Sequence, residues 1–480
     1  MNMLVTPDVP DMPAEFKSTY ERQQRAYRSK RNPSYEERRQ DLRQLHRLIA
    51  ENHDALISAV SQDYGGRASF ETKLAELLGA QDAALDAIKH LRGWMKPSKR
   101  SVDLTQYPLA KAWTFPQPVG VVGIVVPWNF PIAMAFQPMI CAFAAGNRVM
   151  VKMSENSGTL ARLLKQLAAR YFPEDKLAFF EDGGGRGPAF TQLPFDHLFF
   201  TGSPATGKAV MANAARNLTP VTLELGGKSP CIVGPDYSMK KAAERIMWAK
   251  MFNAGQICTN VDYLMLPEGR IDEFIHEAQL IAGKRYPDIL NGDYTAIIDQ
   301  RQYDRIQATL ADALARGATA INLCVGQSGD PARRIFPPHA VLGVTESMEI
   351  MQREIFGPLL PIMTYSSKEE VVEYIGDRHR PLALYVYSDD KALQDYYLNN
   401  TISGGVGINE SVLQGGLHSL PFGGTGHSGM GHYHGLEGFL TFSKLRPVFK
   451  QSPWRSLDML MPPYSGSAGK MLNFMLKRKS

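Results

Sequence analysis

Residues 120–146 read "GVVGIVVPWNFPIAMAFQPMICAFAAG", and this stretch decides the fold. No charged residue occurs between Lys111 and Arg148. Length and apolarity alone would suggest a helix that crosses a membrane. The run is interrupted by Pro127, Pro131 and Pro138, and Asn129 lies in its middle. We therefore interpret it as a buried strand, a sharp turn and a buried helix that begins near Pro131.

The segments on either side continue the same alternation of strand and helix. An apolar run at 147–154 precedes a helical pattern at 159–172, and another run at 197–203 precedes a helical pattern at 205–217. A second series follows residue 221, with a helix expected over 238–255 that ends at Gly255 and a strand over 261–267. Buried strands that alternate with helices predict two α/β domains with mostly parallel sheets. The first hundred residues are expected to be helical.

The composition of the chain excludes several classes of protein. It has 480 residues, 44% of them hydrophobic and 21% charged, which predicts a globular protein of two or three domains. A net charge of +5 is too small to indicate nucleic acid as a partner. The start of the chain lacks the pattern of a signal peptide, so we expect a cytoplasmic protein.

The chain has four cysteines, and one of them differs from the rest in its surroundings. The four are Cys141, Cys231, Cys258 and Cys324, without disulfide or zinc spacing. Three lie in apolar runs, where a cysteine is usually a small buried hydrophobe. Cys258 instead lies in the polar stretch "FNAGQICTN" (252–260). A thiol in a polar loop is expected to be accessible and able to ionise, as a nucleophile must.

Two further segments carry residues suited to chemistry. Glu224 lies near the end of the apolar strand in "VTLELGGKSP" (221–230), just before two glycines. A carboxylate in an apolar strand is costly unless it has a role or a partner. The alternative is a carboxylate that is solvated at the end of the strand. Gly202 and Gly207 bracket a strand-to-helix turn that could hold phosphate. Their spacing matches neither the Rossmann fingerprint nor a P-loop, so a simple tight turn remains possible.

Seven motifs together resemble the NAD(P)-dependent aldehyde dehydrogenase superfamily in their order, over residues 20–450. They are "PWNFP" (127–131), "VKMSE" (151–155), "FTGSPATG" (200–207), "LELGGKSP" (223–230), "FNAGQIC" (252–258), "EIFGP" (354–358) and "PFGGTGHSGMG" (421–431). The ending "LHSLPFGGTGHSGMGHYHG" is similar to the class 3 branch. "PFDHLFFTGS" and "ENSGTLARLL" resemble its bacterial coniferyl-aldehyde dehydrogenases.

The resemblance implies a role for three residues in catalysis. Cys258 matches the nucleophile that attacks the aldehyde carbon. The Asn129 side chain and the Cys258 backbone N–H match the oxyanion hole. Glu224 matches the general base that activates water, so that the product is a carboxylic acid.

The resemblance also implies a set of cofactor-binding residues. Lys152 and Glu155 match the residues at the adenosine ribose. The other matches surround the pyrophosphate and the nicotinamide; they are Trp128, Gly202, Ser203, Gly207, Glu354 and Phe356. A carboxylate at Glu155 favours NAD, although NADP is possible. Met153, Pro204 and Thr206 depart from the common pattern and leave this preference open.

The family fold implies an α/β architecture with a Rossmann-type parallel-sheet cofactor domain, an α/β catalytic domain and a small bridging hairpin. We expect an NAD(P)-binding domain over 1–225, in which about 100–118 join an oligomerisation hairpin. We expect a catalytic domain to follow over 226–408. The chain then returns to the cofactor domain and forms the bridging element over 409–450, and it ends in a C-terminal tail over 451–480. The partners implied are an aldehyde substrate and a second copy in a homodimer.

Several alternatives compete with this interpretation. The histidines at 418, 427, 432 and 434 lack a cysteine or carboxylate partner, so we expect no metal. The tail "KMLNFMLKRKS" (470–480) is basic and amphipathic, but a frayed end or packing on a partner subunit is favoured over contact with a membrane. A CoA-acylating dehydrogenase would not need Glu224. A non-catalytic homologue would need neither Cys258 nor Asn129.

Overall fold

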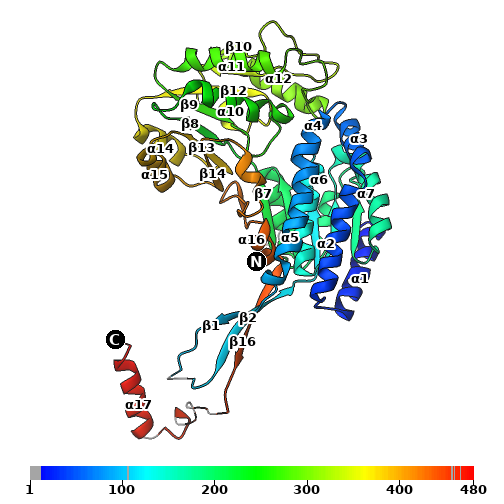
Figure 1. Ribbon diagram of the computed structural model, residues 1–480, viewed down its shortest axis with the longest axis vertical. Helices are drawn as coiled ribbons and strands as arrows, with labels where there is room; N and C mark the ends of the chain where they lie inside the picture. Colours follow the sequence, from blue (N-terminus) through cyan, green and yellow to red (C-terminus); the bar gives the residue numbers. More distant parts are fainter. Residues whose placement is uncertain are drawn as a thin grey trace, which may run out of the picture.

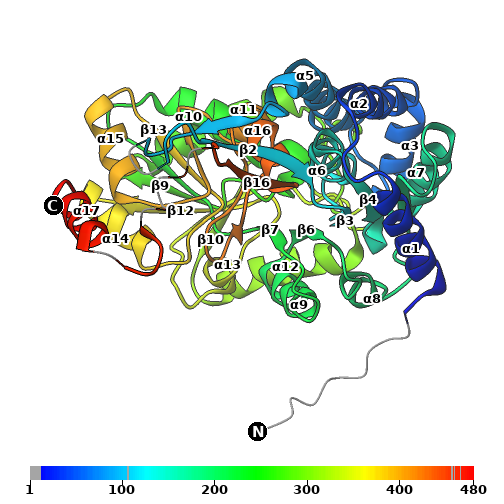
Figure 2. The same ribbon diagram turned by 90° about the horizontal axis from the view of Figure 1, so that it is seen from below.

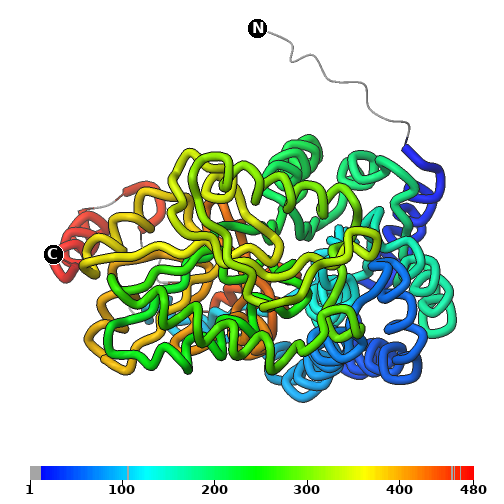
Figure 3. Tube along the Cα trace, turned by 90° about the horizontal axis from the view of Figure 1, so that it is seen from above, coloured from blue at the N-terminus to red at the C-terminus, as the bar shows by residue number. Residues whose placement is uncertain are grey.

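The computed structural model describes residues 12–104, 107–453, 455, 458, 460–464 and 466–479. Two α/β lobes lie side by side, and an antiparallel arm extends away from both (Figure 1). Viewed from above, the N-terminal helices gather at one side and the middle of the chain forms the other lobe (Figure 3). Residues 1–11, on which the signal-peptide prediction partly depends, and six positions of the tail lie outside the described residues.

The first lobe is built on a six-stranded sheet with the order β15-β7-β6-β3-β4-β5. Its strands are parallel, except that β15 runs antiparallel to β7. The bounds are β3 Val121–Val125, β4 Arg148–Lys152, β5 Leu177–Phe180, β6 His197–Gly202, β7 Val221–Leu225 and β15 Gly429–Met430. The parallel strands are almost wholly buried, as expected of a sheet that is covered on both faces.

Helices cover both faces of this sheet. Side chains alternate along β3, so that Val122 and Ile124 face one core while Val121 and Val125 face the other. Figure 2 shows α2 and α5 on one side of the strands and α8 and α9 on the other. The helices of this lobe are α1 Ala14–Ser29, α2 Tyr35–Ala50, α3 His53–Tyr64, α4 Ser69–Thr72, the π-helix η1 Lys73–Leu78, α5 Gly79–Trp94, α6 Pro131–Ala145, η2 Glu155–Ser157, α7 Gly158–Tyr171, α8 Gly187–Thr191, α9 Pro204–Ala215 and α16 Gly435–Thr441.

The structure confirms the interpretation of the stretch that decides the fold. The strand β3 ends at Val125 and the helix α6 begins at Pro131, with every residue of α6 except Met134 buried. Proline at the first position of a helix is favourable, because its missing N–H would have no partner there. Within the described residues, no helix is long and apolar enough to cross a membrane.

The second lobe is built on a seven-stranded sheet with the order β10-β11-β12-β9-β8-β13-β14, in which only β10 is antiparallel. The strands are β8 Pro230–Val233, β9 Tyr263–Pro267, β10 Thr319–Asn322, β11 His339–Leu342, β12 Leu359–Tyr365, β13 Ala383–Tyr387 and β14 Gly405–Ile408. One core packs against α10–α12 and the other against α14 and α15. The helices are α10 Met239–Met251, η3 Phe252–Gly255, α11 Ile271–Arg285, α12 Gln300–Ala315, α13 Glu349–Gln352, α14 Lys368–Gly376, α15 Lys391–Asn400 and η4 Leu413–Gly416.

The predicted end of the helix over 238–255 is wrong by four residues. The α-helix α10 ends at Met251, not at Gly255. Asn253 and Ala254 adopt left-handed φ angles of 51° and 49°, so the chain leaves the helix before it reaches the glycine. This abrupt turn sets the direction in which the chain approaches Cys258.

The arm is a three-stranded antiparallel sheet of β1 Ser98–Arg100, β2 Lys111–Pro118 and β16 Ser443–Lys450. Strand β16 pairs with the full length of β2, from Ser443 opposite Pro118 to Lys450 opposite Lys111. The segment around 100–118 is therefore joined to the end of the chain. Helix α17, Gly466–Lys477, lies near the far end of the arm (Figure 1).

Candidate active site

The carboxyl ends of the parallel strands in the first lobe meet at one edge of the sheet. Asn129 follows β3, Lys152 ends β4, Gly202 ends β6 and Glu224 lies one residue before the end of β7. In open parallel sheets, ligands bind at this edge. The motifs recognised in the sequence thus come together at the expected place.

A cavity of about 260 Å³ lies at this edge and gathers most of the predicted residues. Cys258 reaches it from the second lobe, and the loop before β12 brings Glu354 and Phe356. The predicted residues on its wall are Trp128, Asn129, Gly202, Ser203, Glu224, Cys258, Glu354 and Phe356. Three others, Lys152, Glu155 and Gly207, are not on this wall.

Those three residues have other surroundings. Lys152 is buried and forms an ion pair with Asp182. Glu155 is exposed in η2 and accepts a hydrogen bond of 3.1 Å from Ser154 Oγ. Gly207 lies inside α9, where a Cβ atom would come within 2.7 Å of the Leu225 side chain. Gly207 therefore allows α9 to pack closely on β7.

Asp182, the partner of the predicted site residue Lys152, is a residue that the sequence analysis missed. It follows β5 at the same edge of the sheet, and besides pairing with Lys152 it accepts a hydrogen bond from the Arg186 backbone N–H at 2.9 Å. Its position after the apolar run "LAFF" (177–180), at the end of a parallel strand, was the signal that could have identified it.

The backbone carbonyl of Asn129 is held by three donors from distant parts of the chain. Tyr64 Oη donates to it at 2.9 Å, Arg67 Nη1 at 3.0 Å and Asn253 Nδ2 at 3.3 Å. Arg67 Nη1 also pairs with Glu76 at 2.7 Å, and both side chains are fully buried. We call these five residues, Tyr64, Arg67, Glu76, Asn129 and Asn253, the Asn129 frame.

Glu76 connects this frame to the start of α6. Its Oε2 accepts hydrogen bonds from the backbone N–H groups of Ile132 at 2.6 Å and Ala133 at 3.3 Å. A carboxylate at a helix N-terminus satisfies free N–H groups and is attracted by the helix dipole. The side chain of Glu76 therefore fixes the turn that presents Asn129.

The polar residues beside Cys258 are buried, which differs from the expected exposed loop. Gln256 donates from Nε2 to the carbonyls of Asn253 (2.9 Å) and Ala296 (3.1 Å) and accepts from the Ile298 N–H at 3.0 Å. Asn260 Nδ2 donates to the Gly255 carbonyl at 2.7 Å. These side chains satisfy the backbone of an irregular buried turn, so the turn holds the thiol rigidly.

Burial and negative charge control the acid–base state of Cys258. Cys258 is half-buried as a residue, whereas the other three cysteines are buried. Burial, then the charges of Glu354 and Glu224, raises the pKa of Cys258 to about 12. Burial therefore opposes the ionisation of the thiol that its polar surroundings led us to expect.

The two carboxyl groups of the cavity also resist ionisation. Glu224 is 2% exposed, and neither of its oxygens has a hydrogen-bond partner in the described part of the chain. Burial raises the pKa of Glu224 well above its usual value. Burial first, and then Asp262, raises the pKa of Glu354 to about 8. A buried carboxyl without a hydrogen-bond partner lowers the stability of the fold. Such a group, here Glu224, is typical of an active site, where chemistry justifies the cost.

One edge of this cavity is suited to a phosphate group. The helix α9 begins at its edge, with Ser203 as the N-cap and Pro204 at the first position. Free N–H groups at a helix N-terminus attract phosphate. A Cβ atom on Gly202 would come within 2.5 Å of the Phe200 ring, so a larger residue would collide with that ring. The aromatic rings of Trp128 and Phe356 lie edge to face on the cavity wall, with 5.3 Å between their centroids.

The histidine-rich segment forms contacts other than those of a metal site. His434 Nε2 lies 3.0 Å from Gln137 Oε1, and His427 stacks on His379 with 3.9 Å between ring centroids. Across the residues that the structure describes, no group of three histidine, cysteine or acidic side chains is placed to hold a metal ion.

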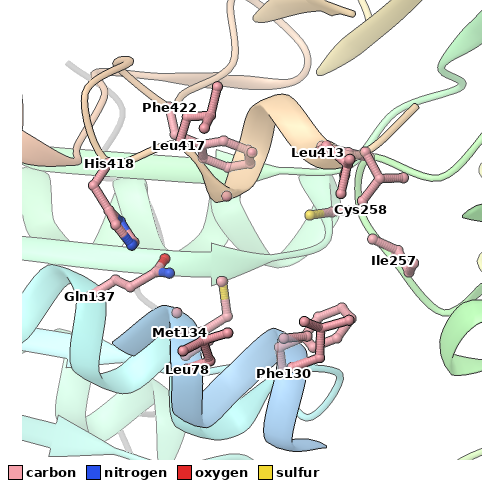
Figure 4. A pocket seen from close by; sticks show the side chains of 18 of the residues that line it. Leu78, Phe130, Met134, Gln137, Ile257, Cys258, Leu413, Leu417, His418 and Phe422 are labelled. Atoms are coloured by element: carbon pink, nitrogen blue, oxygen red, sulfur yellow. The ribbon is translucent and has the colours of Figure 1, made fainter. Parts of the chain in front are cut away.

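A second, larger cavity of about 480 Å³ reaches Cys258 from another side. Its wall is mostly apolar and includes Phe130, Met134, Ile257, Leu413 and Phe422 (Figure 4). Cys258 thus stands between an apolar cavity and the cavity that contains Glu224 and Glu354.

Known proteins share the sequence and fold of this chain. The profile of the aldehyde dehydrogenase family matches residues 9–448. A relative from Pseudomonas aeruginosa, named probable coniferyl aldehyde dehydrogenase, is 45% identical over 459 residues, 95% of each chain. Mouse (Mus musculus) aldehyde dehydrogenase family 3 member B2 is 34% identical over 95% of this chain and 94% of that one. A solved substrate-bound state of Staphylococcus aureus AldH is 32% identical, with a TM-score of 0.89 over 96% of this chain and 99% of that one. These findings confirm the predicted family and fold class.

The Asn129 frame predicts a large loss of stability when its buried ion pair is broken. Glu76→Gln would leave the Arg67 charge buried and unpaired, which costs about 3–5 kcal/mol. Urea unfolding should reveal this loss. The control, Glu36→Gln, removes an exposed partner of Arg39 and should change stability by less than about 0.5 kcal/mol. Equal midpoints for the two variants would show that the frame does not stabilise the fold.

The raised pKa of Cys258 predicts how its reactivity depends on pH. Only the thiolate reacts with iodoacetamide, and below the pKa the thiolate fraction grows about tenfold per pH unit. Alkylation of the ligand-free protein should therefore accelerate steadily from about pH 7 to pH 10. Peptide mapping should locate the label on Cys258, and Cys258→Ala should lose it. A rate that levels off near neutral pH would contradict the raised pKa.

Proposed function

The chain belongs to the aldehyde dehydrogenase family, and we propose that it oxidises an aldehyde to the carboxylic acid with NAD(P)+ through a thioester on Cys258. One observation carries this proposal: the Cys258 thiol, the Asn129 amide and the unpaired Glu224 carboxyl line one cavity. Neither a CoA-acylating enzyme nor a non-catalytic homologue would need Glu224 buried there without a partner.

The first step joins Cys258 to the substrate. The sulfur forms a bond to the aldehyde carbon, and the π electrons of the C=O bond move to oxygen. The Asn129 side chain and the Cys258 backbone N–H stabilise this oxyanion, with one such donor contributing roughly 3 kcal/mol. Asn129 Nδ2 uses one of its two N–H groups for the Gln256 carbonyl at 3.3 Å, which leaves the other for the substrate.

Glu224 provides the base that this chemistry needs. Its raised pKa makes the ionised carboxylate a stronger base than an exposed glutamate, which suits it to remove a proton from the thiol or from water. In the last step, water attacks the thioester while Glu224 accepts a proton. The C–S bond then breaks, the carboxylic acid leaves, and Glu224 returns the proton to the sulfur, which restores the thiol.

The cofactor is held, in this proposal, by residues around the α9 N-terminus and the opposite wall. Gly202 and Ser203 would bind the pyrophosphate, with Trp128 next to it. Glu354 and Phe356 would hold the nicotinamide ribose and ring. Bound NAD(P)+ supplies the acceptor for the two electrons and the hydrogen that the aldehyde carbon loses. The family uses NAD or NADP.

We propose NAD as the preferred cofactor. Glu155 is exposed beyond the end of β4, where a carboxylate would repel the 2′-phosphate of NADP. The charge of Lys152, at the end of β4, is already paired with Asp182. The phosphate would therefore face a negative group with little compensation.

The substrate proposed is an aromatic aldehyde such as coniferyl aldehyde, or a medium- to long-chain aliphatic one. The apolar wall of the 480 Å³ cavity supports this class, and so does the name of the relative from Pseudomonas aeruginosa. Ranking aromatic and straight-chain aldehydes by kcat/KM tests the choice, and a preference for small polar aldehydes would contradict it.

A homodimer is proposed from the arm. Strands β1 and β16 are its two edges, and most of their residues are exposed. An exposed edge strand presents unpaired N–H and C=O groups with which a second chain can pair. Sedimentation equilibrium should give twice the mass of one chain, and a single-chain mass would contradict the proposal.

Removal of the base should stop the reaction at the thioester. Glu224→Gln keeps the size of the side chain but cannot accept a proton, and a positioned base contributes about 10²–10⁴-fold. We expect at most about one NADH per active site followed by very slow turnover. The exposed Glu268→Gln serves as the control and should turn over normally. Steady turnover by Glu224→Gln at the wild-type rate would exclude Glu224 as the base.

Removal of the charge at Glu155 should weaken the preference for NAD. Repulsion between two charges in water is about 1 kcal/mol at short range, so Glu155→Gln should lower the NAD-to-NADP ratio of kcat/KM about fivefold. The control is Glu373→Gln, an exposed position on α14 in the other lobe. An unchanged ratio in Glu155→Gln would remove Glu155 from the cofactor site.

A further inference from the structure

One face of α6 forms a wall of the 480 Å³ cavity. Phe130, which precedes the helix, and Ala133, Met134 and Gln137 follow the spacing i, i+3, i+4 and i+7, which places them on a single face. The wall therefore runs along the helix from the turn of Asn129 towards Gln137. Its last member is polar, although the others are apolar.

A polar end of the cavity lies opposite the thiol. Figure 4 shows Gln137 and His418 at one side and Cys258 at the other, with apolar side chains such as Met134 and Leu417 between them. The side chains of Gln137 and His418 point towards one another. The only acidic residue on this wall, Asp82, is exposed.

The amide of Gln137 is oriented by a buried neighbour. Burial lowers the pKa of His434 to about 3, so this imidazole is neutral. His434 Nε2 lies 3.0 Å from Gln137 Oε1 and donates to it. The amide oxygen of Gln137 therefore already accepts a hydrogen bond. The N–H groups of the same amide remain able to donate to a ligand.

The imidazoles at this end have unused hydrogen-bonding capacity. Behind Gln137 lies a cavity of about 10 Å³ shared by His418 and His434, which is close to the minimum for one water molecule. In the described part of the chain, the Nδ1 atoms of both histidines are buried without a hydrogen-bond partner. Burial lowers the pKa of His418, and its neutral ring already donates to the Gly79 backbone, so its other nitrogen can still accept a hydrogen bond. The end is suited to a polar group, since unpaired buried nitrogens are costly.

We propose that Gln137 and His418 bind a hydroxyl group at the far end of the aldehyde, and so select 4-hydroxycinnamaldehydes. This inference rests on the proposed aldehyde oxidation at Cys258. A hydroxyl group both donates and accepts, which matches an amide N–H beside a neutral imidazole. Gln137 and His418 determine specificity in this account and take no part in the chemistry.

The length of the cavity favours a three-carbon aldehyde chain on the ring. Phe130 packs with Ile257, the residue before Cys258. Gln137 lies seven residues after Phe130, and a helix rises about 1.5 Å per residue, so these two ends of the wall are about 10 Å apart. Bonds of about 1.4–1.5 Å put the hydroxyl of 4-hydroxycinnamaldehyde roughly 8 Å from the aldehyde carbon, and a hydrogen bond adds about 2.8 Å. A 4-hydroxybenzaldehyde is shorter by two carbons and falls short.

The test compares substrates that differ only in the hydroxyl group. We would measure kcat/KM for 4-hydroxycinnamaldehyde and cinnamaldehyde with wild type, Gln137→Met and His418→Leu. Wild type should favour the hydroxylated substrate about tenfold, and each variant should lower this ratio about fivefold. The matched control, Leu417→Ala, removes an apolar neighbour of His418 from the same wall and should affect both substrates equally. For benzaldehyde and its 4-hydroxy derivative, the hydroxyl preference should be small in every variant.

The possible failures are distinguishable. If wild type oxidises cinnamaldehyde but both variants keep the hydroxyl preference of wild type, the polar end holds a structural water and the inference is wrong. Equal hydroxyl preferences for cinnamaldehyde and benzaldehyde would also overturn it, since length would not matter. If no aldehyde yields NADH, the proposed function itself fails and this inference fails with it.

Discussion

Three hydrogen bonds to one peptide oxygen, the carbonyl of Asn129, fix the geometry on which the site depends. Their donors come from the end of α3, from the buried Arg67 and from the left-handed turn after α10. The first two belong to the helical layer of one lobe, and Asn253 belongs to the other lobe. The same interaction therefore orients the Asn129 amide and joins the lobes beside Cys258. Because the groups are buried, each lost bond would leave an unpaired polar atom, and the arrangement resists distortion.

A second consequence of this rigid, buried construction is electrostatic. Cys258, Glu224 and Glu354 share one cavity, and burial raises the pKa of all three groups. Without ligands, the site therefore favours protonated groups and an unreactive thiol. A carboxyl group with a high pKa is also a stronger base once it ionises. The burial that keeps the thiol protonated therefore also makes Glu224 a stronger base, as its proposed role requires.

The sequence was sufficient to predict the features that depend on local pattern. Strand β3 and helix α6 follow from an apolar run punctuated by prolines, and Cys258 and Glu224 stand out because their residue types conflict with their surroundings. The Asn129 frame could not be predicted, because Tyr64 and Glu76 are ordinary helical residues and Arg67 lies in the short connection after α3, and their role appears only when the fold brings them to Asn129. The early end of α10 was missed because two left-handed residues that are not glycine have no signal in composition. The polar residues beside Cys258 suggested exposure, although they serve to satisfy a buried turn.

The central claim is that aldehyde oxidation passes through the sulfur of Cys258 and no other. The chain has four cysteines, so replacing Cys141, Cys231 and Cys324 by alanine leaves Cys258 alone. The decisive measurement is NADH formation with cinnamaldehyde by this variant and by Cys258→Ala, each checked for folding by circular dichroism. The account predicts that the chain with Cys258 alone retains activity and that Cys258→Ala has none. Continued oxidation by a folded Cys258→Ala protein would contradict it.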